Sequence, residues 1–200
     1  MGNRQLAGQE KKTTAHRPSP IAHGLASFVF RTKLGWMGLT ASAKGVRAIV
    51  LAKPSRHAAE RALQSEASDN GHSADGTRAM LRDAQRQVLR YLAGRSRMLD
   101  FPVDLSGGTP FQRKVWQAAM RIPYGRARSY QWIASKVGGK RYARAVGSAL
   151  GANPVLLIVP CHRVVAHDAS LGGFAWGLAV KRRLLELEGT LALLKKGARR

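Results

Sequence analysis

Cys161 and His162 lie side by side in the stretch PCHRVV, and Cys161 is the only cysteine in the chain. A free thiol has a pKa of about 8.5, so only a few per cent is thiolate at neutral pH, and a nucleophilic cysteine needs a base or a positive environment. His162 is a candidate base. Neighbours along an extended chain point in opposite directions, so a bend at Pro160 or a bridging water would have to connect the two groups. The alternative is that Cys161 is a small, buried and inert residue, as most free cysteines are.

Glu188 is the acidic residue that could orient His162. It ends a predicted helix in the stretch LLELEG, where a negative charge opposes the helix dipole by about 0.3–1 kcal/mol. A carboxylate in that position is expected to have a cationic partner, and a carboxylate behind an imidazole fixes its tautomer and stabilises its charged form. The alternatives are a solvated glutamate or a surface ion pair with Lys181 or Arg182.

The charge of the chain predicts a polyanionic partner. Lys and Arg number 34 against 11 Asp and Glu, a formal net charge of +23, and no acidic residue occurs between Asp104 and Asp168. This favours nucleic acid first and an anionic membrane surface second. A membrane-spanning run of about 18 apolar residues is absent from the sequence. One cysteine excludes an intramolecular disulfide and a cysteine-rich zinc site, which fits a reducing, intracellular setting.

The first half of the chain predicts a small α/β domain over residues 25–107, after a disordered basic tail at 1–24. Short β-rich stretches at 27–32, 35–42 and 46–52 predict an antiparallel sheet, and 55–64 and 77–94 predict helices. The stretch MLDFPVDLSGG at 98–108 predicts a further short strand, with Pro102 at a sheet edge.

The second half predicts a mainly α domain over residues 108–190. Thr109 is a good N-cap for a helix that ends before Pro123, and 129–153 predicts two helices around a Gly138–Gly139 turn. That pattern is typical of a helix-turn-helix, with a plain helical hairpin as the alternative, and the basic residues across it favour DNA. The stretch VLLIVP at 155–160 predicts a buried strand or extended run, 178–188 a final helix, and 191–200 a basic tail.

Five stretches in this order resemble the O6-alkylguanine-DNA alkyltransferases, also called methylated-DNA–protein-cysteine methyltransferases: FQRKVWQ at 111–117, GRARSYQWIA at 125–134, RAVGSALGANP at 144–154, PCHRVV at 160–165 and LLELEG at 184–189. The resemblance implies a monomeric, single-turnover protein that binds double-stranded DNA, flips out O6-alkylguanine, mainly O6-methylguanine, and moves the alkyl group irreversibly to Cys161. It implies no cofactor, and the cysteine zinc ligands of some relatives are absent here. The cytoplasm, or the nucleoid in a bacterium, is the expected location.

The resemblance also implies a role for each matching residue. Cys161 matches the alkyl acceptor, His162 a base acting through a water, and Glu188 the acid behind it. Asn153 matches the residue that orders the active-site turn, Arg144 the finger that replaces the flipped base, and Tyr130 a donor to the guanine. The remaining matches are DNA contacts (Arg128, Ser129, Ala143, Ala145, Gly147) and pocket residues (Leu150, Pro160, Val164, Gly172, Phe174, Ala175, Trp176).

Two departures affect the pocket. Phe174 and Ala175 stand where some relatives have Tyr and Ser, which removes two side-chain donors, and Trp176 stands where some have glycine, which should narrow the pocket. Three other functions explain fewer of these sequence features. A lesion-binding protein without transfer activity would not need Cys161, a thiol hydrolase would not need a basic helix-turn-helix, and a DNA-binding regulator would not need the Cys161–His162 pair.

Overall fold

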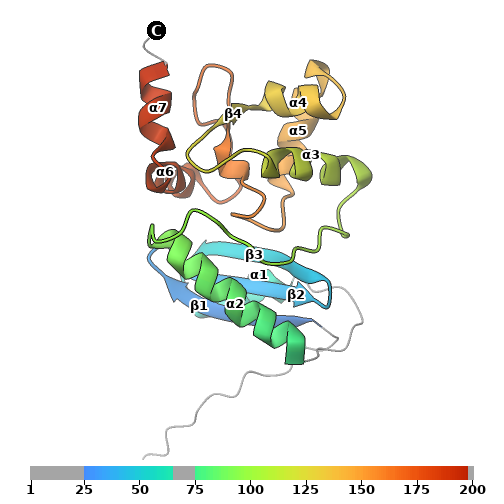
Figure 1. Cartoon of the computed structure of the whole chain (residues 1–200), viewed down its shortest axis with the longest axis vertical. Helices are drawn as coiled ribbons and strands as arrows, with labels where there is room; N and C mark the ends of the chain where they lie inside the picture. Colours follow the sequence, from blue (N-terminus) through green and yellow to red (C-terminus); the bar gives the residue numbers. More distant parts are fainter. Residues whose placement is uncertain (1–24, 65–74, 198–200) are drawn as a thin grey trace, which may run out of the picture.

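The computed structural model describes residues 25–64 and 75–197. A sheet-containing N-terminal part lies below a mainly helical C-terminal part in Figure 1. This agrees with the predicted fold class. Buried residues of both parts belong to one continuous hydrophobic core, so the boundary predicted at residues 107 and 108 stays a prediction. The tail predicted at 1–24 lies outside the described residues. None of the described helices has the length and apolar character needed to cross a bilayer.

The N-terminal sheet is antiparallel in the order β1-β2-β3, as predicted. Its strands are β1 (Ala26–Thr32), β2 (Gly35–Ser42) and β3 (Gly45–Lys53). Met37, Leu39 and Ala41 share one side of β2 and are fully buried in the core that α2 (Asp75–Leu92) completes. Gly38 points to the other side, where an added Cβ would lie 2.6 Å from Leu63 of α1 (Arg56–Gln64). The two helices therefore cover opposite faces of the sheet.

Two stretches with strand-like sequences, 98–108 and 155–160, do not form strands in the structure. The stretch at 98–108 makes a single bridge to β3: the amide of Val46 donates to Pro102 O (2.8 Å) and the amide of Asp104 donates to Val46 O (2.9 Å). Pro102 has no N–H with which to extend such a ladder. The stretch at 155–160 folds back on itself, because Leu157 adopts a positive φ of 73° and Leu156 bridges Val159.

The C-terminal part begins at the predicted N-cap, Thr109, which forms a capping box with Gln112. Thr109 accepts a hydrogen bond from the amide of Gln112, the Gln112 side chain accepts one from the amide of Thr109, and Pro110 occupies the first turn of α3 (Pro110–Met120). The chain continues through β4 (Arg128–Ser129), α4 (Tyr130–Val137), the 3-10 turn η1 (Lys140–Tyr142) and α5 (Ala143–Gly151). Gly138 and Gly139 both have positive φ at the turn, as a helix-turn-helix requires.

The chain ends in two packed helices. The 3-10 turn η2 (Cys161–Arg163) and β5 (Val164–Val165) lead to α6 (Leu178–Leu187), and Gly189 then reverses the chain with a φ of 72°. α7 (Thr190–Gly197) covers most of the stretch 191–200, for which the sequence predicts a basic tail. The stretch TLALLKK is rich in good helix formers, and α7 packs against α6.

Candidate active site

Cys161 lies in η2 with a side chain that is almost fully buried, and Pro160 supplies the predicted bend with φ −82° and ψ 61°. The side-chain amide of Asn153 donates a hydrogen bond to Cys161 Sγ at 3.2 Å. Burial raises the pKa of the thiol, and the Asn153 amide, the Lys181 ammonium and nearby backbone amides oppose that rise. The sulfur is therefore a protonated thiol at rest, in surroundings that would stabilise its thiolate.

Asn153 also shapes the turn that carries the cysteine. Its Nδ2 donates to Val159 O at 2.9 Å as well as to the sulfur, and its Oδ1 accepts from the amide of Val155 at 3.0 Å. The side chain replaces the backbone ladder that a strand at 155–160 would have made. One buried amide thus connects the end of α5 to the cysteine.

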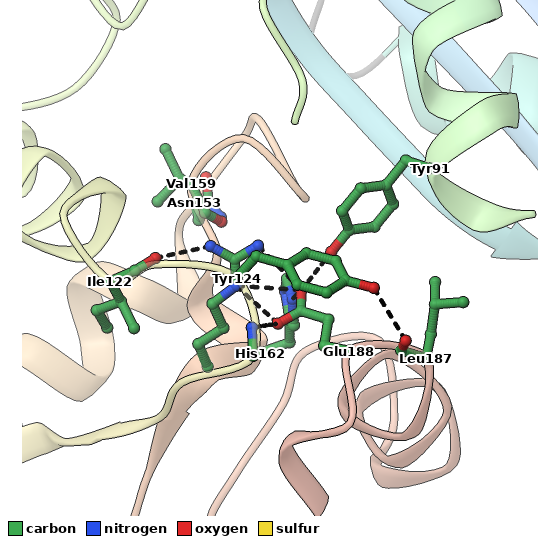
Figure 2. Close-up of polar contacts among 10 residues, drawn as sticks. Tyr91, Ile122, Tyr124, Asn153, Val159, His162, Leu187 and Glu188 are labelled. Atoms are coloured by element: carbon green, nitrogen blue, oxygen red, sulfur yellow. Dashed lines mark hydrogen bonds and ion pairs between the residues drawn. The ribbon is translucent and has the colours of Figure 1, made fainter. Parts of the chain in front are cut away.

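His162 and Glu188 form the pair that the helix-end argument predicted. His162 Nε2 lies 2.8 Å from Glu188 Oε1, and both side chains are buried (Figure 2). Burial would raise the pKa of Glu188, but hydrogen bonds and charge from His162, then Arg163 and Tyr91, lower it to about 2. Burial, aided by the charges of Arg163 and Lys181, lowers the pKa of His162 against the pull of Glu188.

These shifts define the tautomer of the resting imidazole. A neutral ring has one donor nitrogen and one acceptor nitrogen, and an ionised carboxylate only accepts. Nε2 therefore carries the proton and donates a hydrogen bond to Glu188, which leaves Nδ1 of His162 with a lone pair. Such a ring can accept a proton, and the carboxylate behind it would then stabilise the imidazolium.

Arg163 and Tyr91 complete the environment of Glu188, and the sequence analysis missed both. Arg163 Nε donates to Oε2 at 2.9 Å and Nη2 donates to Oε1 at 3.0 Å, while Nη1 donates to Ile122 O at 2.7 Å. The hydroxyl of Tyr91, at the end of α2, donates to the same Oε1 that His162 contacts (Figure 2). Arg163 belongs to the PCHRVV motif and could have been suspected. Tyr91 is 97 residues from Glu188 and gave no local signal.

Lys181 is the second buried cation, and it does not pair with Glu188 as one alternative supposed. Its ammonium donates to Val164 O at 2.6 Å, to Leu171 O and to Gly173 O at 3.3 Å. Burial lowers the pKa of Lys181 to about 8, although charge on Cys161 would raise it. This cation holds together the loop that follows the cysteine.

A cavity of about 320 Å³ opens onto the sulfur. Of the predicted pocket residues, Leu150, Phe174, Ala175 and Trp176 line it, whereas Pro160, Val164 and Gly172 do not. The lining is completed by four residues with other predicted roles (Tyr130, Gly147, Asn153, Cys161) and by three unpredicted ones (Gly151, Leu156, Gly173). Val164 is fully buried behind the site, and Gly172 packs against the ring of Tyr130.

Trp176 forms the wall of the cavity nearest the N-terminal part. Its indole packs against the cluster of Val50, Ala59 and Leu63, and the ammonium of Lys53 lies 4.5 Å from the ring centroid. A cation over an indole face is attracted by the ring quadrupole. Residues of the N-terminal sheet and α1 therefore position one wall of the pocket.

The helix-turn-helix lies directly beside the cavity. β4 pairs in parallel with β5, Arg128 opposite Val164, so that α4 starts next to the chain that follows the cysteine. Ser129 caps α4 through the amide of Trp132, and Tyr130 reaches the cavity, with its hydroxyl 3.3 Å from Gly173 O. The DNA contacts predicted on α5 are Ala143, Arg144, Ala145 and Gly147. Arg144 and Ala145 are exposed, Ala143 is half-buried and Gly147 lines the cavity beside Tyr130.

Comparison with known proteins finds one family in both sequence and structure. The profile described as 6-O-methylguanine DNA methyltransferase, DNA binding domain, matches residues 110–190. A methylated-DNA–protein-cysteine methyltransferase of Methanosarcina acetivorans is 45% identical over 109 residues, which cover 54% of this chain and 69% of that protein. Its counterpart in Mycobacterium tuberculosis is 48% identical over 106 residues, which cover 53% of this chain and 64% of that protein.

Solved structures extend the similarity into the N-terminal part. The crystal structure of Mycobacterium tuberculosis OGT in complex with DNA superposes with a TM-score of 0.67 at 33% identity, and covers 82% of this chain and 92% of that one. An O6-methylguanine-DNA methyltransferase from Pyrococcus kodakaraensis gives a TM-score of 0.57 at 27% identity, over 82% of this chain and 99% of that one.

Proposed function

Since the chain belongs to the O6-methylguanine-DNA methyltransferase family, we propose that it repairs DNA by direct reversal of damage. It takes O6-alkylguanine, mainly O6-methylguanine, out of duplex DNA and transfers the alkyl group irreversibly to Cys161. One molecule thus repairs one lesion as a monomer, without a cofactor. We place this activity in the cytoplasm, at the nucleoid if the source is a bacterium, because DNA is its substrate.

The observation that carries the proposal is the position of one thiol at the junction of three features. Cys161 lies against Asn153, faces a cavity large enough for a nucleobase, and precedes a buried His162–Glu188 pair. The exposed basic helix-turn-helix adjoins the same cavity. A hydrolase acting on small molecules would need the thiol and the base but not this DNA-binding surface.

Binding delivers the base to the sulfur. Arg128 and Ser129 contact phosphates, and the small residues Ala143, Ala145 and Gly147 let α5 approach the minor groove closely. Extrusion of a base costs a few kcal/mol, least for a poorly paired one, which biases selection towards the lesion. Arg144 fills the gap that the base leaves, while Tyr130, Leu150, Phe174, Ala175 and Trp176 enclose the guanine.

Transfer then proceeds as a displacement at the alkyl carbon. Nδ1 of His162 takes the thiol proton through a water, and Glu188 stabilises the imidazolium. A bond forms between the sulfur and the alkyl carbon as the carbon–O6 bond breaks, and the guanine leaves with that electron pair. Burial, then the charge of Cys161, raises the pKa of Tyr130, so its hydroxyl stays protonated and donates to the guanine. The thioether product has no route back, which makes the reaction single-turnover.

Intact-mass measurement tests the proposal. Incubation with a duplex that contains O6-methylguanine should add one methyl group per protein molecule, located on Cys161 by peptide mapping, without further turnover. Lesion binding with no adduct would identify a binding protein instead. Repeated turnover, or an adduct on another residue, would also contradict the proposal.

Replacement of Tyr91 by phenylalanine tests the contact between α2 and the acid. Loss of a hydrogen bond to a buried carboxylate should cost about 1.5–3 kcal/mol of folding free energy. It should also raise the pKa of Glu188, so the acid limb of the single-turnover rate profile should move to higher pH. Tyr124→Phe is the matched control, because the Tyr124 hydroxyl donates to Leu187 O (2.9 Å) rather than to the carboxylate. An unchanged pH profile in Tyr91→Phe would remove Tyr91 from the catalytic network.

Replacement of Lys181 by methionine tests the second buried cation. Methionine keeps much of the volume but removes the charge that favours the thiolate and the donor that holds three carbonyl groups. We expect the pKa of Cys161 to rise and the transfer rate to fall by roughly 10- to 100-fold at neutral pH. A rate–pH profile should show part of this loss recovered at higher pH. A loss that is equal at every pH would mean that Lys181 acts only on the loop structure.

A further inference from the structure

The outer face of α2 carries a row of arginines that the proposed function does not use. Arg78, Arg82, Arg86 and Arg90 follow one another at intervals of four residues, and all four are exposed. The opposite face of α2, with Leu81, Ala84, Val88 and Tyr91, is buried in the core. Residues four apart lie one above another on a helix, so the four side chains form a stripe, called here the arginine stripe.

Most of the arginine stripe has no ion pair within the described residues, although Asp83 and Asp100 line one hollow with Arg86 and Arg90. Among the described residues, only Arg86 has an acidic partner, Asp83 at 2.7 Å, and the side chains of Arg78, Arg82 and Arg90 make no hydrogen bond or ion pair there. Like charges at this spacing destabilise an isolated helix by about 0.2–0.5 kcal/mol per pair. α1 differs, because its Arg56 is paired with Glu60 at the same spacing (2.8 Å). The repulsion along α2 would be relieved by a ligand with several negative charges.

Duplex DNA matches the arginine stripe in charge and length. Twelve residues from Arg78 to Arg90 rise about 18 Å along the helix axis, and a duplex presents about ten phosphates over that length. Guanidinium groups bind phosphate oxygens in pairs, which makes arginine the preferred residue for such contacts. Arg86 and Arg90 also line a hollow of about 540 Å³, whose other residues include Asp83 and Asp100. Contacts between guanidinium groups and phosphates carry no sequence information, so the stripe would bind the backbone without regard to sequence.

α2 belongs to the sheet-containing part, whereas α4 and α5 lie in the other part of the molecule (Figure 1). We propose that the arginine stripe binds the phosphate backbone of a second duplex segment while the helix-turn-helix holds the first. This inference rests on the proposed function for the first segment. Its consequence is that the protein bridges two segments of DNA, and the high effective concentration of the second favours direct transfer between them during the search for lesions.

A bridging assay tests the proposal with the full chain. An undamaged duplex is fixed to beads, protein is added at low salt, and capture of a second, fluorescent duplex is measured. The variant R78Q/R82Q/R90Q removes the three unpaired charges and keeps good helix formers. It should capture at least tenfold less of the second duplex. Its methyl transfer from O6-methylguanine DNA should stay within twofold of the wild type.

The matched control is R61Q/R182Q/R183Q, which removes the same charge from exposed positions on α1 and α6 and should bridge like the wild type. The salt dependence adds a second measurement. If the arginine stripe contacts three phosphates, the log–log slope for bridging should become less steep by about 2.7 in the stripe variant, at ~0.9 per contact. Arg144→Ala should also reduce bridging, because each duplex needs its own surface.

Three outcomes would overturn the proposal: a wild-type protein that does not bridge, a stripe variant that bridges equally well, or a control that loses bridging to the same extent. If two protein molecules associated and each bound one duplex through its helix-turn-helix, the stripe variant would bridge as well as the wild type. Failure of methyl transfer in the wild type would instead contradict the proposed function, and methyl transfer is measured separately on the same samples.

Discussion

Cys161→Ser is expected to abolish alkyl transfer and to leave DNA binding unchanged. A serine hydroxyl is far less nucleophilic than a thiolate, and the neutral imidazole of His162 could not ionise it to a useful extent. The oxygen is smaller than sulfur and still able to accept from Asn153, whose amide lies 3.2 Å from the native sulfur. The pocket and the turn should therefore keep their form. Intact mass after incubation with O6-methylguanine DNA should show no methyl group on the variant.

Binding of the same duplex, measured by fluorescence anisotropy, should remain within about threefold of the wild type, because the basic surface is untouched. Cys161→Ala is the companion variant, since it also removes the contact with Asn153. A methyl adduct that persists in either variant would place the acceptor elsewhere. Loss of DNA binding in both would mean that the cysteine turn supports the binding surface, and the missing adduct would then reflect lost binding and not lost nucleophilicity.

Glu188→Gln is expected to damage stability and activity together. The carboxylate is fully buried and accepts from Arg163, His162 and Tyr91 at once. A neutral amide leaves the guanidinium of Arg163 buried without its counter-charge, which typically costs about 3–5 kcal/mol. It also presents one acceptor where two are needed. The imidazolium of His162 would lose its stabilising charge, and we expect the transfer rate to fall by about 10²- to 10⁴-fold.

Glu186→Gln supplies the matched control, because Glu186 lies on α6 only two residues away and its side chain is exposed. Urea unfolding gives the stability difference and single-turnover kinetics the rate. The control should differ from the wild type by less than about 0.5 kcal/mol. If Glu188→Gln were as stable as the control and transferred the methyl group as fast, the buried network would contribute neither to stability nor to alkyl transfer.

Glu188 also sets an acid limit on stability. Its folded-state pKa of about 2 lies below the ordinary value of 4.5, so the carboxylate binds a proton less readily in the folded state. The stability that it contributes is fully present above pH 4.5 and is lost as the pH falls towards 2. Unfolding free energies measured across this window should fall more steeply for the wild type than for Glu188→Gln.

Local patterns predicted most of the helices and the sheet. The β-rich stretches of the antiparallel sheet, the N-cap at Thr109 and the glycine turn at 138 and 139 all act over a few residues, and each was confirmed. One error lies where the hydrogen bonds of a side chain decide the path of the backbone. The run at 155–160 looks like a strand, but the Asn153 side chain takes the hydrogen bonds that a strand would need.

The residues of the site also divide into those with a local signal in the sequence and those without one. Cys161 and His162 are adjacent, and Glu188 was suspected because a negative charge at a helix end needs a partner. Tyr91 and the carbonyl groups around Lys181 come from other elements, and nothing in their local sequence marks them. Pro160, Val164 and Gly172 do not line the cavity, although all three lie close to it in the sequence or in the fold.

The contacts of Glu188 have a consequence for folding kinetics. Its carboxylate collects donors that are 97, 63, 26 and 25 residues away along the chain, on α2, the turn before β4, and η2. Contacts of such separation form only after long loops have closed, which makes them slow relative to the local helices. Secondary structure should therefore return early in refolding, and a competent thiol only in the last kinetic phase. During that interval the chain would bind DNA through its helices before it is able to repair it.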